Sequence, residues 1–117
     1  MDANIQAMPK HTVLPLDPAI QAMIDATNRG DSAAFLKAFA ENAVLDDWGR
    51  TFSGRAEIAK WNSDENIGTQ NHLRVTGVER DGMQMRVNVT VTGKGYNGDG
   101  TFVFDIGPNG IMRLVIS

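Results

Sequence analysis

The stretch AVLDDWGRTFSGRAEIAKW, from Ala43 to Trp61, decides how this chain folds. A short apolar strand ends there in two adjacent carboxylates, Asp46 and Asp47, and Trp48 follows them directly. A turn then leads into a helix with one apolar side. The ends of strands commonly carry binding chemistry, because a rigid scaffold positions them. Placing two carboxylates beside a tryptophan near the core costs free energy unless they have charged or hydrogen-bonding partners or serve a function. This pair is therefore a candidate site.

The composition is that of an ordinary globular chain with one domain. Its 117 residues can bury roughly two-thirds of the surface that the unfolded chain exposes. Hydrophobic residues make up 42% of the chain and charged residues 21%. The net charge of -3 argues against nucleic acid or an anionic membrane as the main partner. Because the chain has no cysteine, it has no thiol nucleophile and no thiolate metal ligand.

Residues 1–16 are expected to form an N-terminal tail, and residues 17–117 a single domain. The tail lacks the basic segment and the continuous apolar run of a signal peptide. No apolar run in the sequence reaches the length that spans a bilayer. The expected location is therefore the cytoplasm.

Three helices are predicted in the first half of the chain. Asp17 and Pro18 form a helix start, with a capping carboxylate before a proline at the first helical position. Gly30 ends that helix, and Asp31 can cap the next one. The third helix is expected from about Arg55 to Asn62. The apolar faces of the first two helices are Ile20, Met23, Ile24 and Thr27, and then Phe35, Leu36 and Phe39.

From Leu73 onward the apolar period changes to two, which is typical of strands. Asp81 and Gly82 predict a hairpin turn, and Asn109 and Gly110 predict a second. The residues expected to face the core on the longest strand are Met83, Met85, Val87, Val89 and Val91. Those expected on its opposite face are Gln84, Arg86, Asn88, Thr90 and Thr92. Helices first and an antiparallel meander afterwards indicate an α+β fold, with N-terminal helices packed in a strongly curved sheet.

This order of elements resembles the nuclear transport factor 2-like superfamily, which includes ketosteroid isomerases, scytalone dehydratase and SnoaL-like polyketide cyclases. The residues that carry the resemblance are Asn28 to Asp31, Phe35 to Phe39, Ala43 to Gly49, Ser53 with Gly54, Ile58 and Trp61. The resemblance implies a cone, in which a curved antiparallel sheet wraps a long helix and leaves a pocket at the open end. It also implies dimers that pair their sheets back to back. The function does not follow from it, because this scaffold hosts many functions.

The resemblance to ketosteroid isomerases implies a general base at Asp47. Burial would raise the pKa of such a carboxyl toward the working range. The donor groups of that chemistry are missing, since Met23 and Phe102 fall at two of their positions and Asn62 falls near a third. Each lost donor typically costs about 3–4 kcal/mol of transition-state stabilisation. The sequence therefore predicts a poor isomerase.

Several other candidates have a structural interpretation beside the functional one. Because adjacent strand residues point to opposite faces, at most one of Asp46 and Asp47 can face a pocket. The other would be solvated or would bond backbone amides in the turn. For Asp47 itself, ligand contact or chemistry and a structural turn role both stay open. Trp48 and Trp61 are expected as core or pocket wall rather than as stacking platforms for a cofactor.

The remaining polar motifs do not predict a metal or phosphate site. His11 and His72 are both expected to be solvated, and no ligand spacing on one element supports a metal. The glycine-rich segment 93–100 lacks the serine or threonine of a phosphate loop and the ligands of a calcium loop. The segment is predicted to be a long hairpin loop that can cover one edge of a pocket. No cofactor is expected.

The expected function is the binding of a small apolar or aromatic molecule in an apolar pocket. Asp47 would be the main polar group there and the candidate catalytic residue. The expected pocket walls are Met23, Phe39, Trp48, Trp61, Met85, Val87 and Phe102. A homodimer through the outer face of the sheet is also expected. Two alternatives stay open: an isomerase, dehydratase or cyclase that uses Asp47 as general acid or base, and a non-catalytic dimerisation or interaction module with a filled cone.

Overall fold

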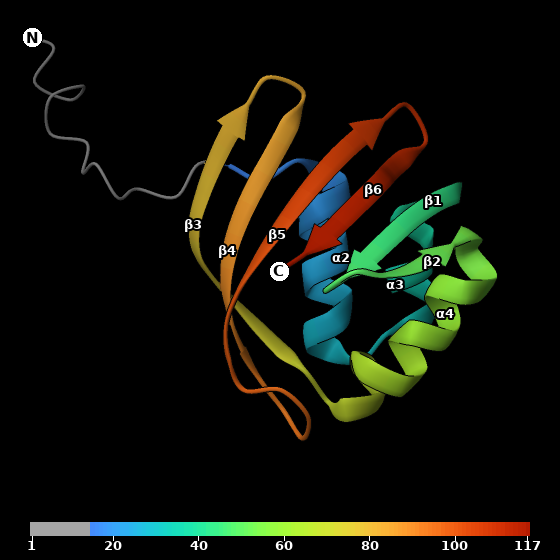
Figure 1. Cartoon of the computed structure of the whole chain (residues 1–117), viewed down its shortest axis with the longest axis vertical. Coiled ribbons are helices and arrows are strands. Elements are labelled where there is room, and N and C mark those ends of the chain that lie inside the picture. Colours follow the sequence, from blue (N-terminus) through green and yellow to red (C-terminus); the bar gives the residue numbers. More distant parts are fainter. Residues whose placement is uncertain (1–14) are drawn as a thin grey trace, which may run out of the picture.

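The computed structural model describes residues 15–117, so the expected tail, with His11, lies almost wholly outside the described residues. Figure 1 shows helices, a short strand pair, another helix and then long strands. No helix in the described part is long and apolar enough to cross a membrane. The elements are α2 (Pro18–Arg29), α3 (Ser32–Lys37), β1 (Phe39–Asp47), β2 (Arg50–Ser53), α4 (Gly54–Glu65), the 3₁₀ turn η1 (Ile67–Thr69), β3 (His72–Asp81), β4 (Gln84–Thr92), β5 (Gly98–Gly107) and β6 (Gly110–Ile116).

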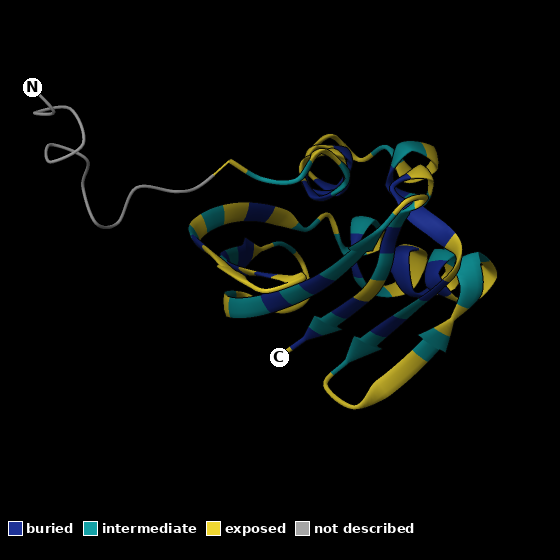
Figure 2. Ribbon diagram, turned by 90° about the horizontal axis from the view of Figure 1, so that it is seen from above, coloured by how far each residue is buried: buried dark blue, intermediate teal, exposed yellow. Residues whose placement is uncertain are grey.

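The strands form one sheet in the order β2-β1-β6-β5-β4-β3. Every neighbouring pair is antiparallel except β1 and β6, which run parallel. The sheet curls, and the helices lie on its concave side (Figures 1 and 2). Buried residues alternate with exposed ones along the strands, as the colours of Figure 2 show. The expected α+β fold with a strongly curved sheet is confirmed, and the parallel pair is an addition to it.

Irregular strand pairing gives the sheet its curvature. The register of β3 against β4 shifts between Val75 and Gly77, and that of β5 against β6 shifts between Asp105 and Ile106. Such bulges bend a strand and increase its twist. Both predicted hairpins are confirmed, since β3 leads directly into β4 and β5 into β6. Each turn lies one residue from its predicted position, with Gly82 and Met83 in the first and Pro108 and Asn109 in the second.

The helix ends follow the local signals of the sequence. The Asp17 side chain accepts a hydrogen bond of 2.9 Å from the backbone N–H of Ala19. Gly30 ends α2 in the left-handed region at φ 74°, where a glycine has no steric penalty. Asp31 then caps α3 by accepting a hydrogen bond of 3.0 Å from the backbone N–H of Ala34. These three predicted roles are confirmed.

The Asp31 cap predicts a pH-dependent contribution to stability. The hydrogen bond from Ala34 lowers the pKa of Asp31 below its usual value of 3.8. The contribution is therefore complete above that value and is lost as the pH falls through the lower pKa of the folded state. In Asp31→Asn, the amide oxygen can still cap the helix but carries no charge. We expect this variant to unfold more easily than wild type at about pH 7 and the gap to close toward about pH 2. Denaturant titrations along that range measure it, and a gap that does not change with pH would contradict the prediction.

Two residues lie in other elements than the sequence predicted, although Phe39 is buried in the core as expected. Phe39 opens β1, opposite Ile111 of β6, instead of extending the second helix. Its carbonyl accepts hydrogen bonds of 3.1 and 2.7 Å from the Arg55 guanidinium, which helps to hold the chain in an extended course. Met83 sits in the turn between β3 and β4 and is 83% exposed, because the two-residue turn is Gly82 and Met83, one residue later than predicted. The third helix also runs on to Glu65, past the predicted end at Asn62.

Candidate functional site

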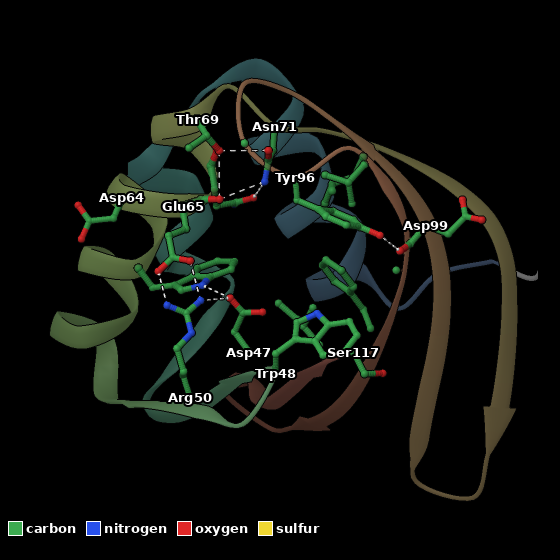
Figure 3. Close-up of a pocket in the computed structure, with 18 residues that line it drawn as sticks. Asp47, Trp48, Arg50, Asp64, Glu65, Thr69, Asn71, Tyr96, Asp99 and Ser117 are labelled. Carbon is green, nitrogen blue, oxygen red and sulfur yellow. Dashed lines mark hydrogen bonds and ion pairs between the residues drawn. The ribbon is translucent and has the colours of Figure 1, made fainter.

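A pocket of about 430 Å³ opens where several strands end on the concave side of the sheet. Figure 3 shows it between α4 and η1 on one side and the curled strands on the other. The carboxyl ends of β1, β4 and β6 meet there with the amino ends of β3 and β5. Its lining is Asp47, Trp48, Arg50, Trp61, Asp64, Glu65, Asn66, Thr69, Asn71, Leu73, Val91, Gly95, Tyr96, Asp99, Gly100, Phe102, Ile116 and Ser117.

The deeper lining is apolar and well supported. Its buried apolar members are Trp61, Leu73, Val91, Phe102 and Ile116. The Trp61 ring stacks on the buried Phe35 ring at a centroid distance of 6.3 Å, which fixes its orientation. The Phe102 ring packs at 6.2 Å from Phe104. An apolar molecule in this pocket would therefore meet rigid, poorly hydrated surfaces.

Asp47 is the carboxylate that borders this apolar wall. Its Oδ2 accepts a hydrogen bond of 3.0 Å from Nε1 of Trp61 and one of 2.7 Å from Nη2 of Arg50. No described residue donates a hydrogen bond to its other oxygen, Oδ1, which points into the pocket in Figure 3. The side chain is only 13% exposed. One oxygen of Asp47 is thus anchored and the other faces the pocket.

Asp46 has the structural role that the sequence left open. Its Oδ1 accepts a hydrogen bond of 2.9 Å from the backbone N–H of Gly49, inside the β1–β2 turn. The turn places both Trp48, at φ 52°, and Gly49, at φ 86°, in the left-handed region. Trp48 lines the pocket mouth with 73% of its surface exposed. Asp46 therefore stabilises the turn on one face of β1, and Asp47 faces the pocket on the other.

Arg50 completes the polar side of the pocket, and sequence reasoning missed it. Its Nη1 and Nη2 bond the two carboxylate oxygens of Glu65 at 2.8 and 2.6 Å, and Nη2 also bonds Asp47. The hydrogen bonds that Arg50 donates to Glu65, with the charge of both carboxylates, raise the pKa of Arg50 above its usual range. Two local patterns in the sequence could have indicated these contacts. Asp47 and Arg50 flank a tight turn, and Trp61 and Glu65 lie one helical turn apart on the same side of α4.

A buried network of amides and hydroxyls supports the other side of the pocket. Nδ2 of Asn66 donates to Oδ1 of Asn62 at 3.0 Å and to Oγ1 of Thr27 at 3.2 Å. Oδ1 of Asn66 accepts from Nδ2 of Asn71 at 3.2 Å. Thr69 in turn donates to the side chain of Asn71 at 3.1 Å. The network ties α2, α4 and η1 together and fixes the pocket residues Asn66, Thr69 and Asn71.

The structure divides the predicted wall residues into two groups. Asp47, Trp48, Trp61 and Phe102 line the pocket. The other four are packed in the core and do not line it: Met23, Phe39, Met85 and Val87. They point inward as predicted, but they lie farther along the sheet, where helix side chains fill the concave side. Their inward direction was therefore not enough to place them on the pocket.

The glycine-rich segment closes one side of the pocket. The backbone N–H of Lys94 donates to the Thr69 carbonyl at 2.8 Å, which joins the loop to η1. The Tyr96 hydroxyl donates to the Asp99 carbonyl at 2.7 Å, and its ring lies at the pocket mouth. His72 is exposed and does not line the pocket. Among residues 15–117, no three acidic or imidazole side chains converge as metal ligands.

Comparisons with known proteins agree with this fold. The family model of the SnoaL-like domain matches residues 20–114. A structure from Sinorhizobium meliloti, provisionally described as a polyketide cyclase, is 26% identical, with a TM-score of 0.80 over 87% of this chain and 95% of that one. A protein so described from Xanthomonas campestris pv. campestris is 25% identical, with a TM-score of 0.69 over 84% and 85%. No curated protein matches the chain.

A further structure, from Kribbella flavida and provisionally described as a ketosteroid isomerase, shares the fold at 19% identity. Its TM-score is 0.72 over 84% of this chain and 73% of that one. Together with the family match, these likenesses confirm the expected nuclear transport factor 2-like cone fold.

Proposed function

We propose that this chain, which belongs to the SnoaL-like family, binds a small and mainly apolar molecule in the pocket beside Asp47. One observation carries the proposal: an apolar wall adjoins a single carboxylate oxygen that no described residue engages. Pockets of this kind hold a ligand by burying its apolar body and orient it with a few polar groups. The two neighbours described as polyketide cyclases support an aromatic or cyclic ligand.

Catalysis is the second candidate, because Oδ1 of Asp47 could take a proton from a bound substrate. An isomerase, dehydratase or cyclase would also need donors that stabilise the developing negative charge. The donors that contact Asp47 are already bonded to carboxylates: both N–H groups of Arg50 Nη2 bond Asp47 and Glu65, and Trp61 bonds Asp47 itself. The Asn71 amide likewise donates to the Glu65 carbonyl and to Asn66. Binding is therefore the better supported function.

A neutral aromatic probe tests the proposed binding. We expect 1-naphthalenemethanol, with about 12 heavy atoms, to bind with a dissociation constant on the order of 0.1 mM. The chain has two tryptophans, and both line the pocket, so their two indole N–H signals in a nitrogen-correlated NMR spectrum report directly on it. Saturable shifts of the Trp61 signal are the expected result. An unchanged spectrum up to the solubility limit of the probe would contradict the proposal.

A plug variant separates binding in the pocket from binding elsewhere. A Cβ at Gly100 would lie 3.7 Å from the Phe102 ring and 3.8 Å from Val89, which are ordinary contacts. Gly100→Leu therefore fits the strand and extends into the pocket that Gly100 lines. We expect it to abolish the probe-induced shifts. Thr92→Leu is the matched control, because Thr92 is exposed, lies outside the pocket lining and gains the same side chain.

We further propose a homodimer through the outer face of the sheet. Val103 of β5 lies opposite Val115 of β6 on that face, and this valine pair is flanked by Arg86 of β4 and Asp46 of β1. Antiparallel sheets with a second usable face often pair by symmetry. We expect a dimer at micromolar concentration and a monomer for Val103→Arg. Sedimentation velocity measures both, and a wild-type protein that stays monomeric would contradict this proposal.

A further inference from the structure

The group of Asp47, Glu65 and Arg50 at the polar side of the pocket leaves one negative charge without a partner. Asp47 and Glu65 carry two negative charges, and they share the single guanidinium of Arg50. Among the lining residues, Arg50 is the only lysine or arginine. The surplus charge is therefore most accessible at Oδ1 of Asp47, the oxygen that points into the pocket in Figure 3.

The other two lining carboxylates contribute less. Asp64 forms an ion pair of 2.8 Å with Lys60, and its side chain points away from the pocket in Figure 3. Asp99 accepts a hydrogen bond from Thr90 and also points outward. The charge that a bound molecule would meet is thus the one at Asp47.

The aromatic lining suits a positive charge as well. Trp61 and Phe102 lie on the inner wall, and the exposed Trp48 and Tyr96 stand at the mouth. Aromatic faces attract a cation through their negative electron density, most strongly where water is excluded. An anion would meet a guanidinium whose charge two carboxylates already balance: three of the five Arg50 N–H groups and the Trp61 indole N–H bond Asp47 and Glu65.

We propose that the ligand of this pocket is a protonated amine with an aromatic or cyclic body. Its ammonium group bonds Oδ1 of Asp47, and its apolar body lies against Trp61 and Phe102. This inference rests on the proposed binding function and names the class of molecule. A neutral hydroxyl could also donate to Oδ1, but it would leave the surplus charge in place. Charge-assisted hydrogen bonds are roughly twice as strong as neutral ones, so the amine should bind at least about tenfold more tightly.

Three probes of one shape test the proposal. They are 1-naphthylmethylamine, which is cationic at neutral pH, the neutral 1-naphthalenemethanol, and the anionic 1-naphthoate. Calorimetric titration of the wild-type protein should rank the amine first, the alcohol at least about tenfold weaker and the acid last. Added salt should weaken binding of the amine and leave the alcohol nearly unchanged.

Two charge-removing variants locate the effect. Asp47→Asn should bring the affinities for the amine and the alcohol together. Asp81→Asn removes the same charge from an exposed carboxylate that lies outside the pocket lining, so it should keep the preference for the amine. If Asp47→Asn does not fold, as its tryptophan signals would show, the ranking of the three probes in wild type and in Asp81→Asn still decides. If wild type binds the amine and the alcohol equally, the proposal that the ligand is a protonated amine is wrong, and the proposed binding of an apolar molecule is unaffected. If none of the three probes binds, the proposed function itself fails.

Discussion

Replacement of Asn66 by alanine is expected to lower the free energy of unfolding by about 2–4 kcal/mol. The Asn66 side chain is 3% exposed and makes three side-chain hydrogen bonds, to Thr27, Asn62 and Asn71. Alanine removes all three and leaves buried polar groups that lose a partner inside a small cavity. Equilibrium unfolding in denaturant measures the change.

Asn42→Ala is the matched control for this experiment. Asn42 is exposed on β1, and its replacement should change stability by less than about 0.5 kcal/mol. The Asn66 variant should also shift the Trp61 indole signal, because the network fixes the pocket wall next to that ring. If the two alanine variants are equally stable, the buried network does not hold this part of the fold.

The second large effect is expected at Gly68 in η1. A Cβ there would overlap the carbonyl oxygen of Ser63, which belongs to the backbone of α4. No rotamer change can relieve a contact with backbone, so η1 itself would have to move. Gly68→Ala should therefore cost at least about 3 kcal/mol or prevent folding. Thermal unfolding followed by circular dichroism measures the loss.

Gly77→Ala is the control for Gly68. A Cβ at Gly77 meets only the side chain of Asn88 at 3.4 Å, so this variant should retain nearly the stability of wild type. Where Gly68→Ala does fold, a displaced η1 would carry Thr69 with it and weaken probe binding. A Gly68→Ala protein as stable as Gly77→Ala would contradict the packing described for η1.

The sequence predicted those parts of the fold that local chemistry determines. The caps at Asp17 and Asp31 and the hairpin turn at Gly82 depend only on near neighbours. Both caps were found in their predicted places, and the turn was found one residue from its own. The course of Phe39 depends on its pairing with Ile111, which lies far along the chain. No local pattern carries that information, so the residue was assigned to the helix that precedes it.

The site was predictable to a similar extent. Alternation along a strand predicted that only one carboxylate of the pair could face a pocket, and Asp47 is the one that does. The role of Arg50 requires Glu65, fifteen positions away, to lie beside it, which depends on how α4 packs against the β1–β2 turn. The limits of the pocket likewise depend on which inward-facing side chains the helices cover. Met85 and Val87 are covered, and Val91 is not.

The measurement that tests the central claim most directly is an intermolecular nuclear Overhauser experiment on the protein saturated with 1-naphthalenemethanol. The account predicts contacts from the naphthalene protons to the Trp61 indole and the Phe102 ring, and no such contacts in Gly100→Leu. It also predicts a change at the Asp47 carboxylate carbon when the probe binds, because Oδ1 gains a donor. Contacts confined to the outer face of the sheet, or persistence of the pocket contacts in the plugged variant, would contradict it.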